Sequence, residues 1–290
     1  MLNEKAIIVF GEVLYDCFPD GKQVLGGAPF NVAWGVRGFG LHPTLVSAVG
    51  DDQEGRALLT EMQAWGLDTS GMQTHPQYHT GKVNITLADG DASYDICAPR
   101  AWDFIEDQAL QATQLLYHGS LALRSPASRD TFALIAERSA NSIRFFDINL
   151  RAPHYDLEVV KKWIQGTDWL KLNLTELEAI TGHQDLNFEG ATAVLPQLKE
   201  RYAVGNILLT GGSAGATIFG DHGQAVCAPA PAPSAVVDTV GAGDSFSALT
   251  IRGIIQQIPA QKIVQQASAF AAKVCQMRGA TTQSREFYQI

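Results

Sequence analysis

The chain has 290 residues, of which 46% are hydrophobic and 18% charged, so it can bury a sizeable core. Its formal net charge of −9 excludes a general nucleic-acid or anionic-membrane surface, because such surfaces need an excess of Lys and Arg. Scattered cysteines, the lack of a signal peptide and the lack of any apolar run near ~20 residues predict a cytoplasmic protein with reduced thiols.

Short β-rich runs alternate with helical patterns, which is typical of a parallel sheet with helices on both faces. Buried strands are expected at residues 7–10, 44–49, 115–117, 143–147, 169–173 and 206–210. Helices are expected at residues 56–65, 125–140, 188–201 and 260–277. These patterns predict a single α/β domain over residues 1–290.

One region breaks the alternation. Residues 81–87 and 93–96 look like antiparallel strands joined through Asp89-Gly90, a strong hairpin turn. The segment 71–102, joined by residues 13–25, therefore predicts a small β-sheet that projects from the main sheet. We call this smaller sheet the lid.

A glycine-rich motif opens a helical pattern near the C-terminus. Residues 238–244 read Asp-Thr-Val-Gly-Ala-Gly-Asp, and the helical pattern ends at Pro259. Gly241 and Gly243, on either side of Ala242, leave backbone N–H groups bare at the positive end of the helix dipole, where an anion can bind. Asp244 in that first turn could accept a proton beside the anion. The same pattern also suits an ordinary helix cap.

A second glycine-led helix start lies near the N-terminus. Residues 26–33 read Gly-Gly-Ala-Pro-Phe-Asn-Val-Ala, and Pro29 suits the first helical position. Asn31 would face back toward the loop of Gly27. Its amide can both donate and accept hydrogen bonds, as a sugar hydroxyl pair requires.

The two motifs, in this order, resemble the paired signatures of the ribokinase-like (PfkB-type) carbohydrate kinases. Gly11-Glu12 with Asp16, the run 147–151, Asn173-x-x-Glu176 and the run 210–215 also follow the family's order, so the resemblance spans essentially the whole chain. It implies a ribokinase-like central, mostly parallel sheet flanked by helices, with a small β-sheet lid. It also implies ATP-dependent phosphorylation of a primary hydroxyl of a small sugar.

The sugar itself is less tightly specified. The first glycine motif, Asp16 and the run Ala101-Trp102-Asp103 look most like bacterial fructokinases, so fructose is the expected substrate. A 2-keto-3-deoxygluconate kinase and a ribokinase stay open as alternatives. A non-catalytic sugar or nucleotide sensor on the same fold is an alternative of a different class. A nicotinamide-linked dehydrogenase and a P-loop kinase are excluded, because neither glycine motif occurs in the required place.

The resemblance also implies roles for individual residues. The phosphoryl-transfer site would contain Asp244, Gly241, Ala242, Gly243 and Arg151. The sugar would be held by Asp16, Gly27, Asn31, Lys82, Asn84, Trp102 and Asp244. The nucleotide would contact Lys171, Asn173, Thr210, Gly212, Gly215, Gly241, Gly243 and Ser268, the last standing where many relatives carry Asn. Glu176 would lie near Mg²⁺ through water, and Asp238 would belong to a K⁺ site.

Two of these motifs have ordinary structural interpretations as well. Thr175 and Glu178 have the spacing of a capping box, and the run 210–215 could be a plain hairpin turn. The partners implied by the family are ATP and a small sugar, with a homodimer formed through the lid.

Overall fold

Two β-sheets organise the chain in the computed structural model, which describes residues 7–88, 91–110 and 113–290. The strands of the main sheet are β1 (Ile7–Phe10), β4 (Pro43–Gly50), β5 (Met72–His75), β8 (Leu115–His118), β9 (Ile143–Asp147), β10 (Trp169–Asn173), β11 (Asn206–Thr210), β12 (Ala216–Gly220) and β13 (Gly223–Cys227). Within the described residues they lie in the order β13-β12-β11-β10-β9-β8-β1-β4-β5. Pairing is parallel from β5 to β11 and antiparallel at β12 and β13, which confirms a mostly parallel sheet.

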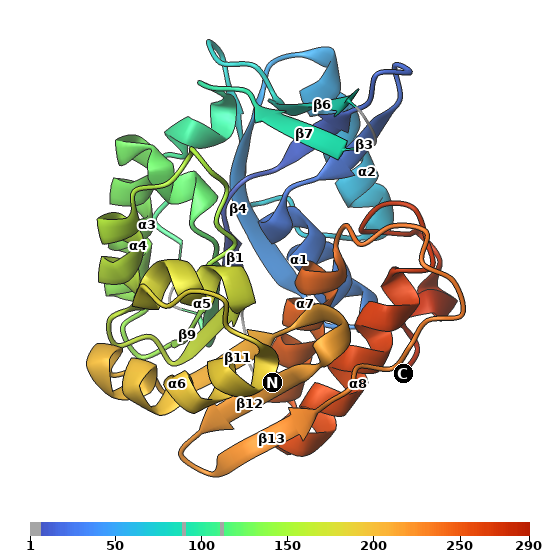
Figure 1. Cartoon of the computed structure of the whole chain (residues 1–290). Helices are drawn as coiled ribbons and strands as arrows, with labels where there is room; N and C mark the ends of the chain where they lie inside the picture. Colours follow the sequence, from blue (N-terminus) through green and yellow to red (C-terminus); the bar gives the residue numbers. More distant parts are fainter. Residues whose placement is uncertain (1–6, 89–90, 111–112) are drawn as a thin grey trace.

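Helices cover both faces of the main sheet (Figure 1). They are α1 (Ala28–Gly38), α2 (Gln53–Trp65), α3 (Pro126–Arg138), α4 (Leu157–Ile164), α5 (Leu174–Thr181), α6 (Phe188–Tyr202), α7 (Ala242–Ile255) and α8 (Ala260–Val274). Buried side chains of α1, α2, α7 and α8 share one hydrophobic cluster, whereas those of α3 to α6 belong to two clusters on the other face. Short 3₁₀ turns occur at Ala101–Phe104, Leu121–Arg124, Gly212–Ala214 and Arg285–Tyr288.

Local sequence explains where these elements begin and end. All four residues of β1 are buried, as expected for a central strand covered on both faces. The side chain of Asp52 accepts a hydrogen bond from the Gly55 amide and caps α2, which ends at Gly66 in the left-handed conformation. Gly27, with φ of 102°, precedes α1 and allows the sharp entry into that helix.

The lid is a separate four-stranded sheet above the main sheet in Figure 1. Its strands are β2 (Leu14–Cys17), β3 (Gln23–Gly26), β6 (Gly81–Ala88) and β7 (Asp91–Ile96), in the order β3-β2-β6-β7. The antiparallel pairing of β6 with β7 confirms that part of the prediction. The predicted turn at Asp89-Gly90 lies outside the described residues.

One predicted part of the lid belongs elsewhere. Met72–His75 (β5), inside the segment 71–102, pairs in parallel with β4 and forms the edge of the main sheet. Its residues alternate too little in polarity to reveal which sheet they join, and the structure assigns them through their neighbour.

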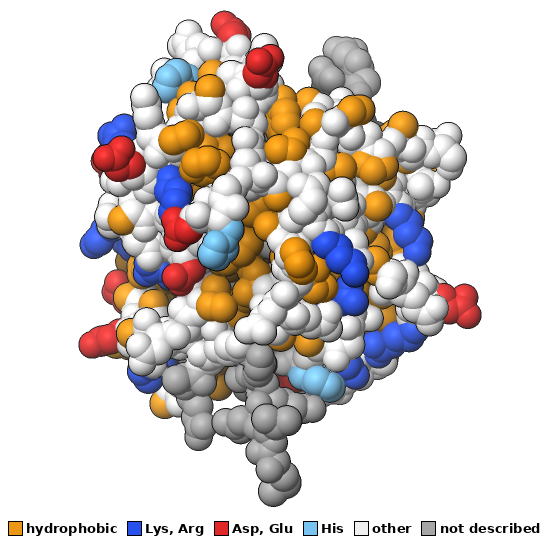
Figure 2. All heavy atoms as spheres, turned by 90° about the horizontal axis from the view of Figure 1, so that it is seen from below, with side chains coloured by type: hydrophobic (Ala, Val, Ile, Leu, Met, Phe, Trp, Pro, Cys, Tyr) orange, Lys and Arg blue, Asp and Glu red, His pale blue; other side chains and the backbone are white. Residues whose placement is uncertain are grey.

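The face seen from below, away from the lid, mixes basic and acidic side chains around hydrophobic ones (Figure 2). None of the four cysteines, all of which are described, forms a disulfide. No helix in the described part of the chain combines the length and apolar character needed to cross a bilayer.

The parallel strands bring distant residues to one edge. Their carboxyl ends point the same way, and in open α/β sheets this edge binds ligands. The register pairs Asn173 of β10 with Thr210 of β11, and Lys171 of β10 with Asp147 of β9. Glu12 follows β1 at the same edge.

Candidate active site

Asp244 lies in the first turn of α7 and is the centre of the site. Its Oδ2 accepts a hydrogen bond of 2.8 Å from Nδ2 of Asn31. Burial raises the pKa of Asp244, and the negative charge of Asp147 adds to this effect. The Asn31 hydrogen bond and the cations Lys171 and Arg151 act in the opposite direction. The result is a carboxylate that is a stronger base than an exposed one.

The backbone before Asp244 forms the predicted anion site. Gly241 has φ of 79°, and a Cβ there would lie 2.2 Å from Cβ of Ala280, so only glycine fits. Gly243 is exposed, and no hydrogen bond to its amide is seen among the described residues. The Ala242 amide donates to the Thr239 carbonyl, so the Gly243 amide is the one left available beside Asp244, where an anionic group can be held.

Asn31 joins the two glycine motifs. It is buried in the first turn of α1, and its Nδ2 is engaged by Asp244. Its Oδ1 is buried without a hydrogen-bond partner among the described residues. A buried oxygen of this kind is costly unless a ligand donates to it, so a sugar hydroxyl fits here.

Asp16 reaches the site from the lid. Burial raises its pKa to about 6, while Arg151 lowers it and Asp244 and Asp238 raise it. These mutual effects place Asp16 in the same electrostatic neighbourhood as Asp244. A Cβ on Gly26 would lie 2.6 Å from Asp16 Oδ2, so glycine at this position makes room for the carboxylate.

Arg151 and Glu12 complete the charged surroundings. Arg151 is exposed and lowers the pKa of Glu12, Asp16 and Asp244. Burial raises the pKa of Glu12 to about 7, and one of its carboxylate oxygens has no partner among the described residues. One exposed cation, Arg151, thus acts on three carboxyl groups.

Lys171 lies beneath the anion site. Its Nζ contacts Asp147 Oδ1 and Oδ2 at 2.9 and 2.8 Å, and both side chains are buried. A Cβ on Gly243 would lie 3.4 Å from Lys171 Nζ, so the ammonium group packs directly against that glycine. The structure therefore brings the predicted nucleotide residue Lys171 to the predicted transfer site.

Asn173 and Glu176 form the capping box of α5, not Thr175 and Glu178 as the spacing predicted. Asn173 Oδ1 accepts from the Glu176 amide, and Glu176 Oε2 accepts from the Asn173 amide. The helix begins two residues earlier than that prediction required. Glu176 Oε1 also accepts from the Leu150 amide, so backbone donors contact both of its oxygens.

The predicted nucleotide loop is also a hairpin connection. Thr210 ends β11, the run continues through a 3₁₀ turn, and Gly215 leads into the antiparallel β12. Gly212 and Gly215 have φ of 60° and 116°, so both stand where glycine is favoured. Ser268 of α8 is buried, in a part of the helix that also contributes Ala267 to the core. Its Oγ is buried without a hydrogen-bond partner among the described residues, and its contact with the nucleotide stays a prediction.

Asp238 lies at the start of the loop that leads to α7. Its Oδ1 accepts from the Val240 amide and its Oδ2 from the Gly279 amide. The carboxylate thus ties this loop to the segment that follows α8. Each oxygen keeps further lone-pair capacity for a cation.

The lid residues predicted to touch the sugar lie elsewhere. Lys82 Nζ forms an ion pair of 2.6 Å with Glu54, and Asn84 contacts Asp95 and Cys97. The strand register puts Asp16 beside Val83, so the neighbouring Lys82 and Asn84 point to the opposite face of the lid. Side chains alternate between the two faces of a strand, and the sequence of one strand does not reveal which face of the sheet a given side chain lies on.

Trp102 is also away from the ligand edge. It is completely buried, and the guanidinium of Arg124 lies 4.1 Å from its ring centroid. Arg124 in turn forms a buried ion pair with Asp103. This motif therefore anchors the base of the lid.

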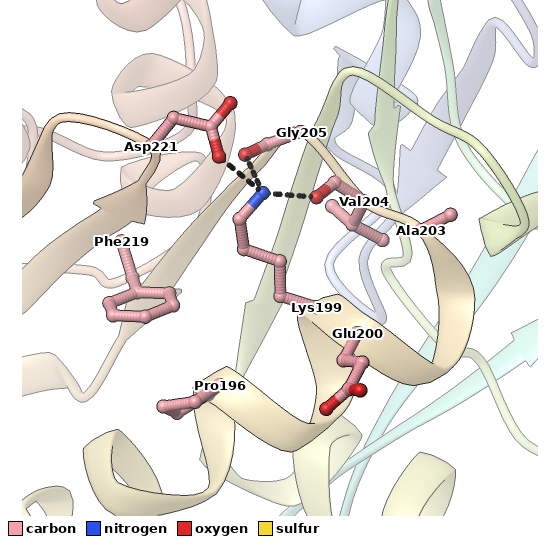
Figure 3. A pocket seen from close by; sticks show the side chains of 8 residues that line it. All are labelled: Pro196, Lys199, Glu200, Ala203, Val204, Gly205, Phe219 and Asp221. Carbon is pink, nitrogen blue, oxygen red and sulfur yellow. Dashed lines mark hydrogen bonds and ion pairs between the residues drawn. The ribbon is translucent and has the colours of Figure 1, made fainter.

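A separate cavity of about 540 Å³ lies at the opposite end of β11 (Figure 3). Lys199 of α6 crosses it and donates to the carbonyls of Val204 and Gly205, both at 2.8 Å. Its Nζ also lies 3.0 Å from Asp221. These contacts secure the chain after α6 and leave the cation fully engaged, so this cavity has no part in the site above.

Three residues near the site were given no role by sequence reasoning. Tyr117 and Ser247 donate to Asp147 Oδ2 at 3.2 and 2.7 Å, and the negative charge of Asp244 acts on Glu12 and helps to raise its pKa. Glu12 had a signal, since it follows a fully apolar strand. Tyr117 and Ser247 had none, because only the fold brings them to Asp147.

Comparisons with known proteins point to one family. A family described as pfkB family carbohydrate kinase matches residues 6–286. Fructokinase of Salmonella typhimurium is 32% identical over 263 residues, 85% of this chain and 83% of that protein. Fructokinase of Klebsiella pneumoniae is 31% identical over 264 residues, 86% of this chain and 84% of that protein. Among solved structures, the chain is similar to a fructokinase double mutant of Vibrio cholerae O395 bound to fructose, ADP and a potassium ion. The TM-score is 0.84 at 22% sequence identity, and the match covers 98% of this chain and 97% of that one, which shows a shared fold.

Proposed function

The chain belongs to the pfkB family of carbohydrate kinases, and on that premise we propose that it transfers the γ-phosphoryl group of ATP to a primary hydroxyl of fructose. It is a phosphotransferase with an alcohol group as acceptor. The observation that carries the proposal is the placement of Asp244. This half-buried base is fixed by Asn31 and lies at the helix start where bare amides can hold a phosphate.

The residues present account for the transfer in a simple way. Asp244 accepts the proton of the sugar hydroxyl as the hydroxyl oxygen attacks the γ-phosphorus and the bond to the ADP oxygen breaks. The Gly243 amide holds the charge of the transferring group, and Lys171 and Arg151 add positive potential. Asp16 and the free Oδ1 of Asn31 bind other sugar hydroxyls.

Mg²⁺ fits this site only as a partner of the nucleotide. Among the described residues, no group of three or more His, Cys, Asp or Glu side chains could hold a metal ion. Glu176, whose oxygens already accept from backbone amides, suits contact through water, the mode that Mg²⁺ tolerates. When bound with ATP, the ion would neutralise phosphate charge.

A K⁺ site at Asp238 is part of the proposal. Support comes from the half-buried carboxylate at the start of the motif that leads to α7. A cation here would stabilise the loop that places Gly241.

Fructose is favoured over acidic sugars by charge. Asp16 would repel a carboxylate or phosphate brought close to it, by several kcal/mol in a partly desolvated site. The relatives at 31% and 32% identity are fructokinases. 2-Keto-3-deoxygluconate would need a cation such as Arg151 for its carboxylate. Ribose would need no such cation.

We also propose a cytoplasmic homodimer that forms through the lid. The lid projects from the main sheet, and its outer face carries Asn84 and Cys97, which a second copy could cover. Light scattering of the wild-type protein tests the dimer, and a monomer at micromolar concentration would contradict it.

A panel of sugars tests the proposed substrate. ADP release would be measured with ATP and each of fructose, ribose, 2-keto-3-deoxygluconate and fructose 6-phosphate. We expect fructose to have the highest kcat/KM. A marked preference for an acidic substrate would overturn the fructose assignment, and ATP binding without transfer to any sugar would favour a sensor.

A further inference from the structure

A buried polar cluster lies beneath the anion site. Asp147, at the end of β9, is 1% exposed and receives Lys171, Tyr117 and Ser247 from three other elements. The distances from Asp147 to these donors are 2.7 to 3.2 Å. Four side chains from β8, β9, β10 and α7 thus meet at one carboxylate.

Stability is a poor explanation for such a cluster. Removing two charges from water is costly, and an apolar pair of similar volume often stabilises a fold as well or better. The positions directly before and after Asp147 and Lys171 are apolar and buried: Phe146, Ile148, Leu170 and Leu172. A charged pair at this one place calls for another reason.

The position of Lys171 supplies that reason. An ammonium group has three N–H donors, and the two hydrogen bonds to Asp147 leave one available. The same Nζ packs against Gly243, 3.4 Å from where a Cβ would stand. The remaining donor therefore lies at the floor of the anion site.

Ser247 links the cluster to the helix. Its Oγ lies 2.7 Å from Asp147 Oδ2 and 3.3 Å from the carbonyl oxygen of Gly243, one turn earlier in α7. The hydroxyl can donate to either acceptor. The Asp147 carboxylate is therefore joined to the turn that carries Asp244.

We propose that Asp147 is a positioning residue for phosphoryl transfer, which fixes Lys171 in its charged form under Gly243 and secures the first turn of α7. This inference rests on the proposed kinase function. Asp147 itself touches no reacting atom, because Lys171 and the α7 turn lie between it and the phosphate.

The electrostatics of Lys171 agree with this role. Burial is the largest single influence and would lower the pKa of Lys171, but the charge and hydrogen bond of Asp147 together with the charges of Glu176 and Asp244 outweigh it, so the pKa is raised. The titratable groups that face Lys171 are Asp147, Tyr117, Glu176 and Asp244. Removal of the Asp147 charge removes the largest influence that raises the pKa of Lys171. Buried lysines without such a partner titrate near or below neutrality.

Asp147→Asn tests the proposal, with Asp130→Asn on the exposed surface of α3 as the matched control. We expect kcat with fructose to fall at least about tenfold at pH 8 and to recover partly at pH 6, because Lys171 regains its proton there. The wild-type protein and the control should show no such fall toward high pH. Lys171→Met combined with Asp147→Asn should abolish the new pH dependence.

Nucleotide binding gives a readout that does not depend on transfer. Calorimetric titration with ADP should show that the affinity of Asp147→Asn falls between pH 6 and pH 8.5 by several-fold more than that of the wild type. Loss of transfer in the wild-type protein would refute the kinase function but leave this binding test intact. A wild-type pH profile together with pH-independent ADP affinity would overturn the proposal.

Ser247→Ala keeps the charged pair and tests the link to α7 if Asp147→Asn does not fold. We expect kcat to fall about fivefold, the worth of one ordinary hydrogen bond, with an unchanged KM for fructose. An unchanged kcat would contradict the role of Asp147 in holding the helix.

Discussion

Asn31 donates a hydrogen bond of 2.8 Å to Asp244, although 213 positions separate the two residues in the chain. The close packing of their helices makes this contact possible. Gly35 of α1 lies so near α7 that a Cβ there would be 2.8 Å from Cβ of Ala248. One amide thus holds the proposed base with its nitrogen and keeps its oxygen available for the proposed sugar.

Replacement of this amide should affect both sugar binding and basicity. In Asn31→Ala, Asp244 loses a hydrogen bond that lowers its pKa, so the acid limb of the kcat/KM profile should move to higher pH. The sugar also loses an acceptor, so kcat/KM should fall about 10- to 100-fold. The pH dependence of kcat/KM for fructose measures both effects, and Asn141→Ala at an exposed position serves as control. An acid limb at the wild-type pH would argue against the orienting role.

Gly243→Val tests the anion site. A branched side chain would enter the space where the phosphate approaches and press on Lys171 Nζ, which lies 3.4 Å from the Cβ position. We expect kcat to fall roughly 10²-fold or more, with a smaller change in fructose binding, because transferring charge is stabilised mainly in the transition state. Gly243→Ala should give an intermediate loss. Unaltered kinetics in both variants would mean that this helix start is only a cap.

Asp16→Ala tests the sugar contact from the lid. Hydroxyls that lose a charged acceptor should weaken fructose use by about 1–3 kcal/mol in kcat/KM. Acidic sugars should be disfavoured less in the variant than in the wild type. Asp20→Ala, at an exposed position on the same lid, is the control. Equal losses in the two variants would show that Asp16 does not contact the substrate.

A pH effect on stability follows from His118. This residue is completely buried between Phe132 and Phe146, and burial lowers its pKa to about 3, from an ordinary value of 6.5. Below pH 6.5 the His118 side chain is therefore protonated in the unfolded chain, whereas in the folded protein it stays neutral until about pH 3. The contribution of His118 to the free energy of unfolding should be fully present above pH 6.5. Below that pH, the free energy of unfolding should fall by up to about 1.4 kcal/mol per pH unit.

Urea unfolding between pH 7.5 and pH 5 measures this slope. His118→Leu should lose less stability on acidification than the wild type, whatever its stability at pH 7.5. His222→Leu, at an exposed position, should keep the wild-type slope. Identical slopes in all three proteins would refute this account of His118.

Much of the fold could be predicted from the sequence because the central strands are short, mostly apolar runs. β1, β9, β10 and β11 have the predicted bounds, since a strand covered on both faces leaves a clear pattern. β12 and β13 were not predicted. They contain alanine, glycine and polar residues and lie at an antiparallel edge of the sheet, where the sequence shows no long apolar run.

The sequence could predict which candidate residues lie together where these residues follow a glycine motif or stand at the end of a central strand. Asn31, Asp244 and Lys171 come together as the motifs indicated. Lys82 and Trp102 were predicted to contact the sugar. The sequence does not reveal on which face of its strand Lys82 lies or how deeply the ring of Trp102 is buried. The capping box was misplaced by two residues, since both spacings fit the same rule.

The proposed base can be tested most directly with Asp244→Asn, which keeps the shape of the side chain and its contact with Asn31 but removes the basicity. Rapid-quench measurement of fructose phosphorylation at saturating ATP would compare the variant with the wild type, and calorimetry would confirm that ATP still binds. The account predicts a fall in kcat of at least about 10²- to 10⁴-fold with modest change in ATP affinity. Near-normal turnover in Asp244→Asn would contradict it.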